Sequence, residues 1–255
     1  MIDLIFAAII QGITEFIPVS SSLHLLIYGS FFSSKTLTLL IIATMHLGSI
    51  FALAIFSLVD TRPQMNILKS IKFNKVIFIA SLPIFLFGFL FYDLISSTTE
   101  INNLIIFTTI VFGIILFISD YYSKNQKKLS DISYYDSIVI GLFQSFSLIP
   151  GVSRSASTII ASRVLNIDRE SSIIVSFILS APVIVGAFSL ALYKINTSDF
   201  ISIDEIWFEV LFAFVFSFIS SYITLRYFYK FSRVKGFSLF AIYRVLLGII
   251  LYVSV

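Results

Sequence analysis

The sequence predicts an all-α polytopic membrane protein with inverted-topology repeats, about six spanning helices and two broken re-entrant helical hairpins. Three observations lead to this prediction. Hydrophobic residues make up 58% of the 255 residues and charged residues only 12%, whereas a soluble domain is about one quarter charged. The apolar runs approach the roughly 20 residues that a spanning helix needs. Two of the runs are interrupted by proline, glycine and serine.

The first interrupted run covers residues 4–30, where Gly12, Pro18 and the serines at 20–22 break the apolar pattern. Irregular backbone at membrane depth is tolerated only where protein or water covers it. We therefore expect a re-entrant hairpin that lines a cavity. The early sequence carries only Asp3 as a charge and lacks the basic region of a cleaved signal peptide, so this segment is expected to stay in the protein.

The second interrupted run covers residues 137–165 and is broken by Pro150, Gly151 and the sequence Ser153-Arg154-Ser155. It is expected to form a second re-entrant hairpin. Six uninterrupted apolar runs are expected to span the membrane, three after each hairpin: residues 37–59, 76–93, 101–119, 172–193, 206–226 and 237–254.

The distribution of lysine and arginine predicts the orientation. These residues concentrate in the segments 60–75, 120–136 and 226–236, which are expected to be cytoplasmic loops. Segment 94–100 has neither residue, and segment 194–205 has one lysine against three acidic residues, so both are expected outside. With these assignments the first hairpin opens outward and the second opens inward.

The chain is expected to form a single membrane domain over residues 1–255. Repeat one covers about 1–120 and repeat two about 136–255, and a basic cytoplasmic loop joins them. Weak internal similarity supports this division, because QGITEFIPVSS at 11–21 and QSFSLIPGVS at 144–153 share Gln, Ile-Pro and Val-Ser. Inverted repeats of this kind place their sites near the midplane, where broken helices meet.

Glu15 and Arg154 are charged residues inside the two interrupted runs. A charge at the bilayer centre costs about 2.5–3.5 kcal/mol, so each needs a reason. One interpretation is a buried ion pair that fixes the hairpins to each other. The other is an anion site, because an arginine beside hydroxyls, a glycine and a helix start suits phosphate oxygens. The residues expected around Arg154 in such a site are Gly151, Ser153, Ser155 and Thr158.

The first hairpin offers complementary groups. Ser20, Ser21 and Ser22 could provide a nucleophile or bind phosphate, or they could simply satisfy backbone groups freed by Pro18. His24 follows closely and could act as a general acid or base, or it could be a packing residue. Glu15 could orient His24, accept a proton or hold a cation.

A single carboxylate together with substrate oxygens suits Mg²⁺ or Ca²⁺, so a divalent cation bound at Glu15 is expected. The chain has no cysteine, and the ligand spacings typical of zinc are absent. His46 and Arg244 are the other polar interruptions of apolar runs. His46 could line the same cavity, but we expect it to be a packing residue. We expect Arg244 to extend toward the interface or pair with a buried acid.

The segments EFIPVSSSLHL and IPGVSRSAST resemble the undecaprenyl-diphosphate phosphatase family of bacterial membranes, the type linked to bacitracin resistance. The resemblance extends over ATMHLGSIFALAIF, NIDRESSIIVSFILSAPVIVGA and AIYRVLLG, and so covers nearly the whole chain. It implies a hydrolase that removes one phosphate from a long polyprenyl diphosphate. The product is the lipid carrier for peptidoglycan synthesis, which connects the activity to cell wall biogenesis and cell shape.

The resemblance also implies roles for individual residues. Glu15 matches the motif glutamate, Ser21 the serine proposed as nucleophile or phosphate ligand, and His24 the proposed acid or base. Arg154 matches the phosphate-binding arginine. Gln11 occupies a position where many members have a second glutamate, which weakens a metal site built by the protein alone. The expected substrate-binding residues are Gln11, Ser20, Ser22, Gly151, Ser153, Ser155 and Thr158.

The expected partners are the polyprenyl diphosphate and membrane lipids, with no nucleic acid; a homodimer is compatible with the sequence. The expected location is the bacterial inner membrane, with an active site open to the periplasmic face. The alternative function is a transporter or flippase for a phosphorylated lipid or anion, because inverted repeats with broken helices are a transporter architecture. Ser21 and His24 separate the two functions, since a carrier needs neither a nucleophile nor a proton shuttle.

Overall fold

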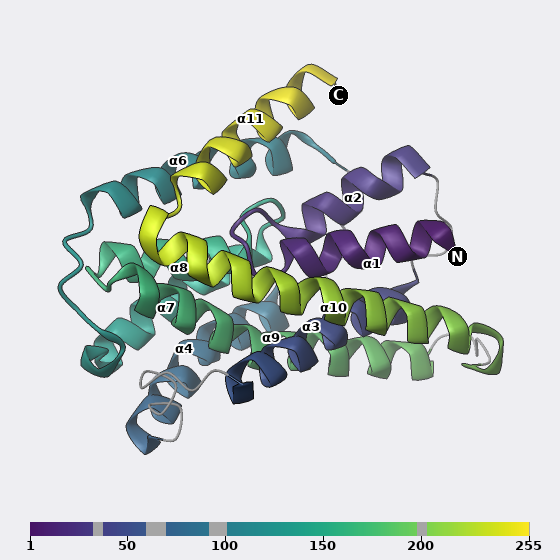
Figure 1. The fold of residues 1–255 in the computed structure, drawn as a ribbon, viewed down its shortest axis with the longest axis horizontal. Coiled ribbons are helices and arrows are strands. Elements are labelled where there is room, and N and C mark those ends of the chain that lie inside the picture. Colours follow the sequence, from purple (N-terminus) through teal and green to yellow (C-terminus); the bar gives the residue numbers. More distant parts are fainter. Residues whose placement is uncertain (33–37, 60–69, 92–100, 198–202, 255) are drawn as a thin grey trace.

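The computed structural model describes residues 1–32, 38–59, 70–91, 101–197 and 203–254 (Figure 1). Within these ranges the chain is helical and contains no strand; the β-type pairing there is one isolated bridge between Lys127 and Ile167. The predicted all-α class is therefore confirmed.

Each interrupted run folds as two short helices joined by an irregular turn. The first run gives α1 (Ile2–Thr14) and α2 (Ser21–Phe32), and the second gives α7 (Tyr134–Ser145), the 3₁₀ turn η3 (Phe146–Leu148) and α8 (Arg154–Val164). Gly12 does not break the first run as predicted, because α1 continues through it to Thr14. The break is confined to residues 15–20 around Pro18.

The longer helices follow each pair in the predicted order. They are α3 (Leu39–Val59), α4 (Ile71–Leu90), α6 (Asn103–Tyr122), α9 (Arg169–Thr197), α10 (Ile203–Lys235) and α11 (Ser238–Ser254), and the 3₁₀ turn η2 (Leu129–Asp131) precedes α7. Among the described residues, five of these helices are long and apolar enough to cross a membrane, and α11 is a shorter apolar helix. The chain is a multi-pass membrane protein.

Parts of the predicted topology fall outside the described residues. These parts are residue 37 of the first span, residues 92–93 of the second, the outer segment 94–100, and much of the segments 60–75 and 194–205.

The segment 226–236 was predicted as a loop, and this was wrong. It continues α10, whose 33 residues correspond to a length of about 50 Å. The guanidinium groups of Arg226 and Arg233 lie 5.9 Å and 5.6 Å from the ring centres of Tyr222 and Tyr229, one turn earlier. Such arginine–tyrosine contacts stabilise the helix beyond its apolar part. The helix ends at Gly236, whose φ of +75° suits glycine.

The helices pack in a reciprocal pattern. α1 lies along α10 and α7 lies along α4, while α6 packs against α11 and α3 against α9 (Figure 1). The first helix of each half thus contacts the fourth helix of the other half. This is the packing that two related halves would give, and their inverted orientation in a bilayer stays a prediction.

A buried charge cluster ties the ends of several helices together. Asp120 of α6 accepts hydrogen bonds from Arg163 Nε at 2.9 Å and from Arg169 Nε and Nη2 at 3.0 Å each. The N–H of Phe237 donates to the same carboxylate at 3.1 Å. Arg163 is fully buried, so these bonds supply the compensation that a buried charge requires. The cluster joins α6, α8, α9 and the start of α11.

Gly12 marks a close approach between α1 and α10. A Cβ at Gly12 would lie 2.6 Å from the carbonyl oxygen of Ser217 and would collide with Ser220 Oγ. We expect Gly12→Ala to lower the free energy of unfolding by about 1–3 kcal/mol, the usual cost of overpacking. Thermal unfolding in detergent measures this change.

Gly29 of α2 is the matched control. A Cβ there meets nothing within 4 Å, and alanine favours a helix over glycine by about 0.8–1.0 kcal/mol. Gly29→Ala should therefore be neutral or stabilising. Equal behaviour of the two variants would contradict the tight α1–α10 contact.

Candidate functional site

The two hairpin tips have the same local geometry. Ser20 and Ser153 directly precede α2 and α8 and adopt φ values of 75° and 74°, in the left-handed region that non-glycine residues rarely occupy. Each serine Oγ accepts a hydrogen bond from the backbone N–H three residues later, at 3.5 Å from Leu23 and 3.4 Å from Ala156. These serines therefore cap the helices that begin at the tips.

Side chains from the second tip bind the first tip directly. Arg154 Nη2 lies 2.7 Å from Glu15 Oε1, and Arg154 Nη1 donates to the carbonyl of Ser176 at 3.1 Å. Ser155 Oγ donates to the carbonyl of Ile17 at 2.9 Å. The structure therefore brings together the two charged residues that the sequence placed in separate interrupted runs.

The Glu15 carboxylate is the centre of a hydrogen-bond network. Its Oε2 accepts from Gln11 Nε2 at 3.1 Å and from Ser21 Oγ at 3.0 Å, and His46 Nδ1 lies 3.0 Å from the same oxygen. Glu15 is buried. The hydroxyl of Ser21, the predicted nucleophile, therefore donates to Glu15, which is one of its two candidate bases.

A cavity of about 340 Å³ opens over this network. Polar side chains from both tips form one part of its lining, and apolar side chains of α3 and α9 form the other. The polar part comprises Glu15, Ser20, Ser21, Ser22, Ser147, Ser153, Arg154 and Ser155 from the tips, together with His46 of α3; the apolar part includes Leu39, Ile42, Ala43, Val183, Ile184, Ala187, Phe188 and Ala191. This division suits a molecule with a charged head and an apolar tail.

The electrostatics of the cavity favour an anion. α2 and α8 both begin at its lining, with Ser21 and Ser22 in the first turn of one helix and Arg154 and Ser155 in the first turn of the other. The first backbone N–H groups of a helix have no partner within the helix, and the helix dipole is positive there. Two helix N-termini and an arginine therefore face one cavity, an arrangement that binds phosphate.

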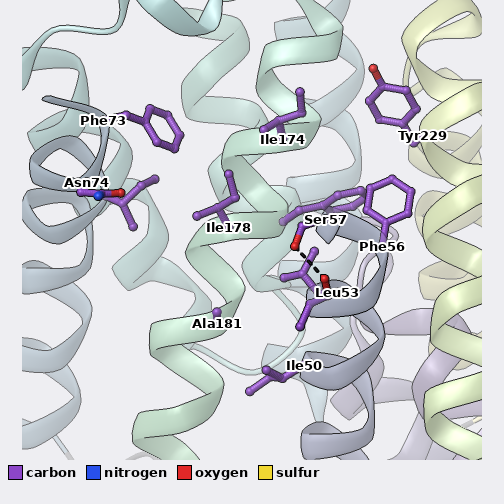
Figure 2. A pocket seen from close by; sticks show the side chains of 13 residues that line it. Ile50, Leu53, Phe56, Ser57, Phe73, Asn74, Ile174, Ile178, Ala181 and Tyr229 are labelled. Carbon is purple, nitrogen blue, oxygen red and sulfur yellow. Dashed lines mark hydrogen bonds between the residues drawn. The ribbon is translucent and has the colours of Figure 1, made fainter. Parts of the chain in front are cut away.

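A second cavity, of about 300 Å³, lies between α3, α4 and α9 and is nearly all apolar. Figure 2 shows Ile174, Ile178, Leu53, Phe56 and their neighbours around it, with Ser57 and Asn74 among the few polar side chains. It contains none of the charged groups found at the hairpin tips. The chemistry is therefore expected in the first cavity.

Most of the predicted site residues lie in or directly behind the first cavity. Gln11 is buried behind Glu15, and Gly151 lines the cavity. Thr158 is buried one turn below the cavity, where its hydroxyl donates to Ser176 Oγ at 2.9 Å. Thr158 thus helps to position Ser176, whose carbonyl oxygen accepts a hydrogen bond from Arg154.

His24 does not line this cavity. Its Nδ1 lies 2.7 Å from the carbonyl oxygen of Ser20, and its Nε2 lies 2.7 Å from the hydroxyl of Tyr243 in α11. The His24 and Tyr243 rings are stacked, with centres 5.7 Å apart. Both ring nitrogens therefore have protein partners, and the catalytic role of His24 stays a prediction.

His46 and Arg244 were both expected to be structural residues. His46 instead lines the cavity, which was the alternative to packing, and it contacts Glu15. Arg244 neither reaches the interface nor has a carboxylate partner among the described residues: it is fully buried and donates to the carbonyls of Thr109, Pro18 and Gly151 at 3.3, 3.2 and 2.8 Å. The sequence signals both residues only as polar side chains within apolar runs. Which groups they contact is shown by the packing of the helices.

The residues present do not fit a divalent cation held by the protein alone. Within the described ranges, no three His, Asp or Glu side chains come together as a metal-binding group. Both carboxylate oxygens of Glu15 already have partners, and its neighbour Gln11 provides an amide where a second carboxylate would be needed. Mg²⁺ and Ca²⁺ sites are built from several oxygen ligands, which this site lacks.

The fold and the site together define a class: an integral membrane protein with a buried arginine–glutamate pair at two helix N-termini beneath an apolar-walled cavity. Within that class, the chain belongs to the family of the bacitracin resistance protein BacA, whose family model matches residues 4–250.

Several curated proteins are similar over their full length. One from Pelagibacter ubique is 35% identical, with 100% of this chain and 98% of that protein covered. One from Teredinibacter turnerae is 33% identical, with 100% and 99% covered, and one from Marinobacter nauticus is 31% identical, with 97% and 96% covered. All three are named undecaprenyl-diphosphatase.

Proposed function

We propose that this chain is an undecaprenyl-diphosphate phosphatase that hydrolyses undecaprenyl diphosphate to undecaprenyl phosphate and phosphate. The reaction recycles the lipid carrier for cell-wall synthesis and explains the connection of the family to bacitracin resistance. The observation that carries the proposal is the Arg154–Glu15 pair between two helix N-termini, in a chain that shares full-length similarity with proteins of this name.

The cavity matches both parts of the substrate. Arg154 and the first N–H groups of α2 and α8 bind the diphosphate oxygens, while the apolar residues of α3 and α9 contact the start of the polyprenyl chain. Arg154 Nη2 donates to the carboxylate of Glu15 at 2.7 Å and to its backbone carbonyl at 3.4 Å, and Nη1 donates to the carbonyl of Ser176. Its guanidinium has five N–H groups, so the remaining donors stay free for phosphate.

Phosphoryl transfer depends mainly on positioning and charge stabilisation. The attacking oxygen, from Ser21 or from water, forms a bond to the terminal phosphorus and gives up its proton to a neighbouring base as the bond to the bridging oxygen breaks and undecaprenyl phosphate leaves. If Ser21 attacks, water then hydrolyses the phosphoserine and releases phosphate. Glu15 lies 3.0 Å from Ser21 Oγ and accepts its hydrogen bond. Glu15 can therefore orient Ser21 or a water molecule for attack, and arginine stabilises the charge that develops on the phosphoryl oxygens.

The proposed location is the bacterial inner membrane, with the cavity open to the periplasmic face. The cavity is lined by the first turns of α3 and the second half of α9. Arg169 lies in the first turn of α9, at the end of that helix away from the cavity, and Arg163 lies beside it at Asp120. Because basic ends favour the cytoplasm, the cavity belongs on the other side.

A divalent cation, Mg²⁺ or Ca²⁺, stays a proposal. The protein lacks the oxygen ligands to hold it alone, so it would arrive with the diphosphate, whose oxygens supply most of its coordination. A homodimer likewise stays a proposal.

The transport function is not favoured, because the full-length relatives are named as diphosphatases.

The test is phosphate release from undecaprenyl diphosphate by the purified protein in detergent, with Mg²⁺, with Ca²⁺ and with a chelator. We expect one phosphate for each lipid molecule and a large loss of activity in Ser21→Ala. Ser57→Ala is the matched control, because Ser57 lies in the apolar second cavity and donates to the carbonyl of Ala54 (Figure 2). Activity of Ser21→Ala near the wild-type level would identify water as the nucleophile. A folded wild type that releases no phosphate under any condition would contradict the proposed function.

A further inference from the structure

The two histidines of the chain have different surroundings. Both ring nitrogens of His24 have protein partners, Ser20 and Tyr243. His46 contacts Glu15 and Gln11 through Nδ1, each 3.0 Å away, and its side chain is 26% exposed in the cavity lining. His46 is therefore the imidazole that an occupant of the cavity can reach.

The hydrogen-bond network assigns the proton of His46. Gln11 Oε1 accepts from Ser217 Oγ at 2.7 Å and from Ser49 Oγ at 3.2 Å, which directs Gln11 Nε2 toward Glu15. The Glu15 carboxylate is paired with Arg154 and offers only acceptors. An unprotonated His46 Nδ1 would accept from Gln11 Nε2 at 3.0 Å but would set its lone pair against the Glu15 carboxylate, whereas a protonated Nδ1 donates to that charged oxygen. The bond to the charged acceptor is the stronger one, and it places the hydrogen on Nδ1. In the neutral ring this leaves Nε2 as an acceptor.

We propose that His46 is a catalytic residue, held by Glu15 through Nδ1, whose Nε2 accepts a hydrogen bond from the attacking group, which is either water or a Ser21 hydroxyl turned from Glu15 toward His46. A carboxylate that fixes the tautomer of a histidine is a recurrent arrangement in hydrolases. Glu15 then contacts both Ser21 and His46, so the attacking group and the imidazole share one anchor. This inference rests on the proposed function, because it assigns a role in that reaction.

Two substitutions separate a catalytic role from a structural one. His46→Asn places an amide near Nδ1 and keeps the bond to Glu15 but removes Nε2, whereas His46→Gln places an amide near Nε2. We expect His46→Asn to lower kcat by about 10²-fold or more with little change in KM, and His46→Gln to recover part of the loss. If His46 only positions Glu15, Asn will be the better replacement, and that result would overturn the proposal.

A second measurement uses the wild-type protein and does not depend on variants that fold. Diethyl pyrocarbonate modifies accessible neutral imidazole, and mass spectrometry locates the modified histidine. We expect His46 to react and to be protected by inorganic diphosphate. Modification of His46 that diphosphate does not reduce would contradict the inference. Because this assay needs no turnover, it gives a result even if phosphate release from the lipid fails.

Discussion

Arg154→Ala is expected to lower kcat/KM for phosphate release by about 10³- to 10⁵-fold, the range for an arginine that stabilises phosphoryl transfer. The substitution removes the donors that face the cavity and also leaves the buried Glu15 without its counter-charge. Breaking a buried ion pair costs about 3–5 kcal/mol, so thermal stability in detergent should fall as well. Activity and unfolding temperature are measured on the same preparation.

Two further arginine variants separate the loss of chemistry from the loss of stability. Arg154→Lys keeps the charge but has no planar fork to reach Glu15 and Ser176 while also binding phosphate, so most of the activity should still be lost. Arg163→Ala removes an arginine of the Asp120 cluster, away from the cavity. It should destabilise the protein while the folded fraction keeps its specific activity. Equal specific activities of Arg154→Ala and Arg163→Ala would contradict a phosphate-binding role for Arg154.

Arg244→Met is expected to produce the second large effect. The guanidinium donates to Pro18 in the first tip, to Gly151 in the second tip and to Thr109 in α6, and it is fully buried. Methionine has a similar length but no donor, so three buried carbonyls lose a partner at about 1–3 kcal/mol each. Because the two tips hold Glu15 and Arg154, we expect both unfolding temperature and kcat to fall sharply.

Thr108→Val provides a graded comparison. The Thr108 hydroxyl donates to the carbonyl of Pro150 at 2.6 Å, so valine removes one bond to one tip, whereas Arg244→Met removes bonds to both. The expected order of stability is wild type, Thr108→Val, Arg244→Met. An Arg244→Met variant with wild-type stability and activity would show that the guanidinium does not hold the tips together.

The sequence by itself determined the class of the protein and the position of the breaks. Hydropathy is a local property, and a run of about 20 apolar residues has few alternatives to a spanning helix. Proline acts equally locally, so Pro18, Pro150 and Gly151 lie between helices as predicted, whereas Ser21, Ser22, Arg154 and Ser155, also counted among the breaks, begin α2 and α8. The local signal fails at two places, where it predicts a break but the helix continues. At Gly12 the cause is the packing of α1 against α10, and after residue 226 it is the arginine–tyrosine contacts along α10.

The tertiary structure alone decided which polar groups share the cavity. His24 lies three residues after Ser21, about 60° away around the helix, so a cavity position and a position against α11 were both open to it. The contact with Tyr243 selects the second position. His46 was expected to pack, yet it contacts Glu15 because α3 lies beside α1 in the fold. Such contacts join residues far apart in the chain, and the rotation and docking of whole helices fix them, which no local pattern of residues encodes.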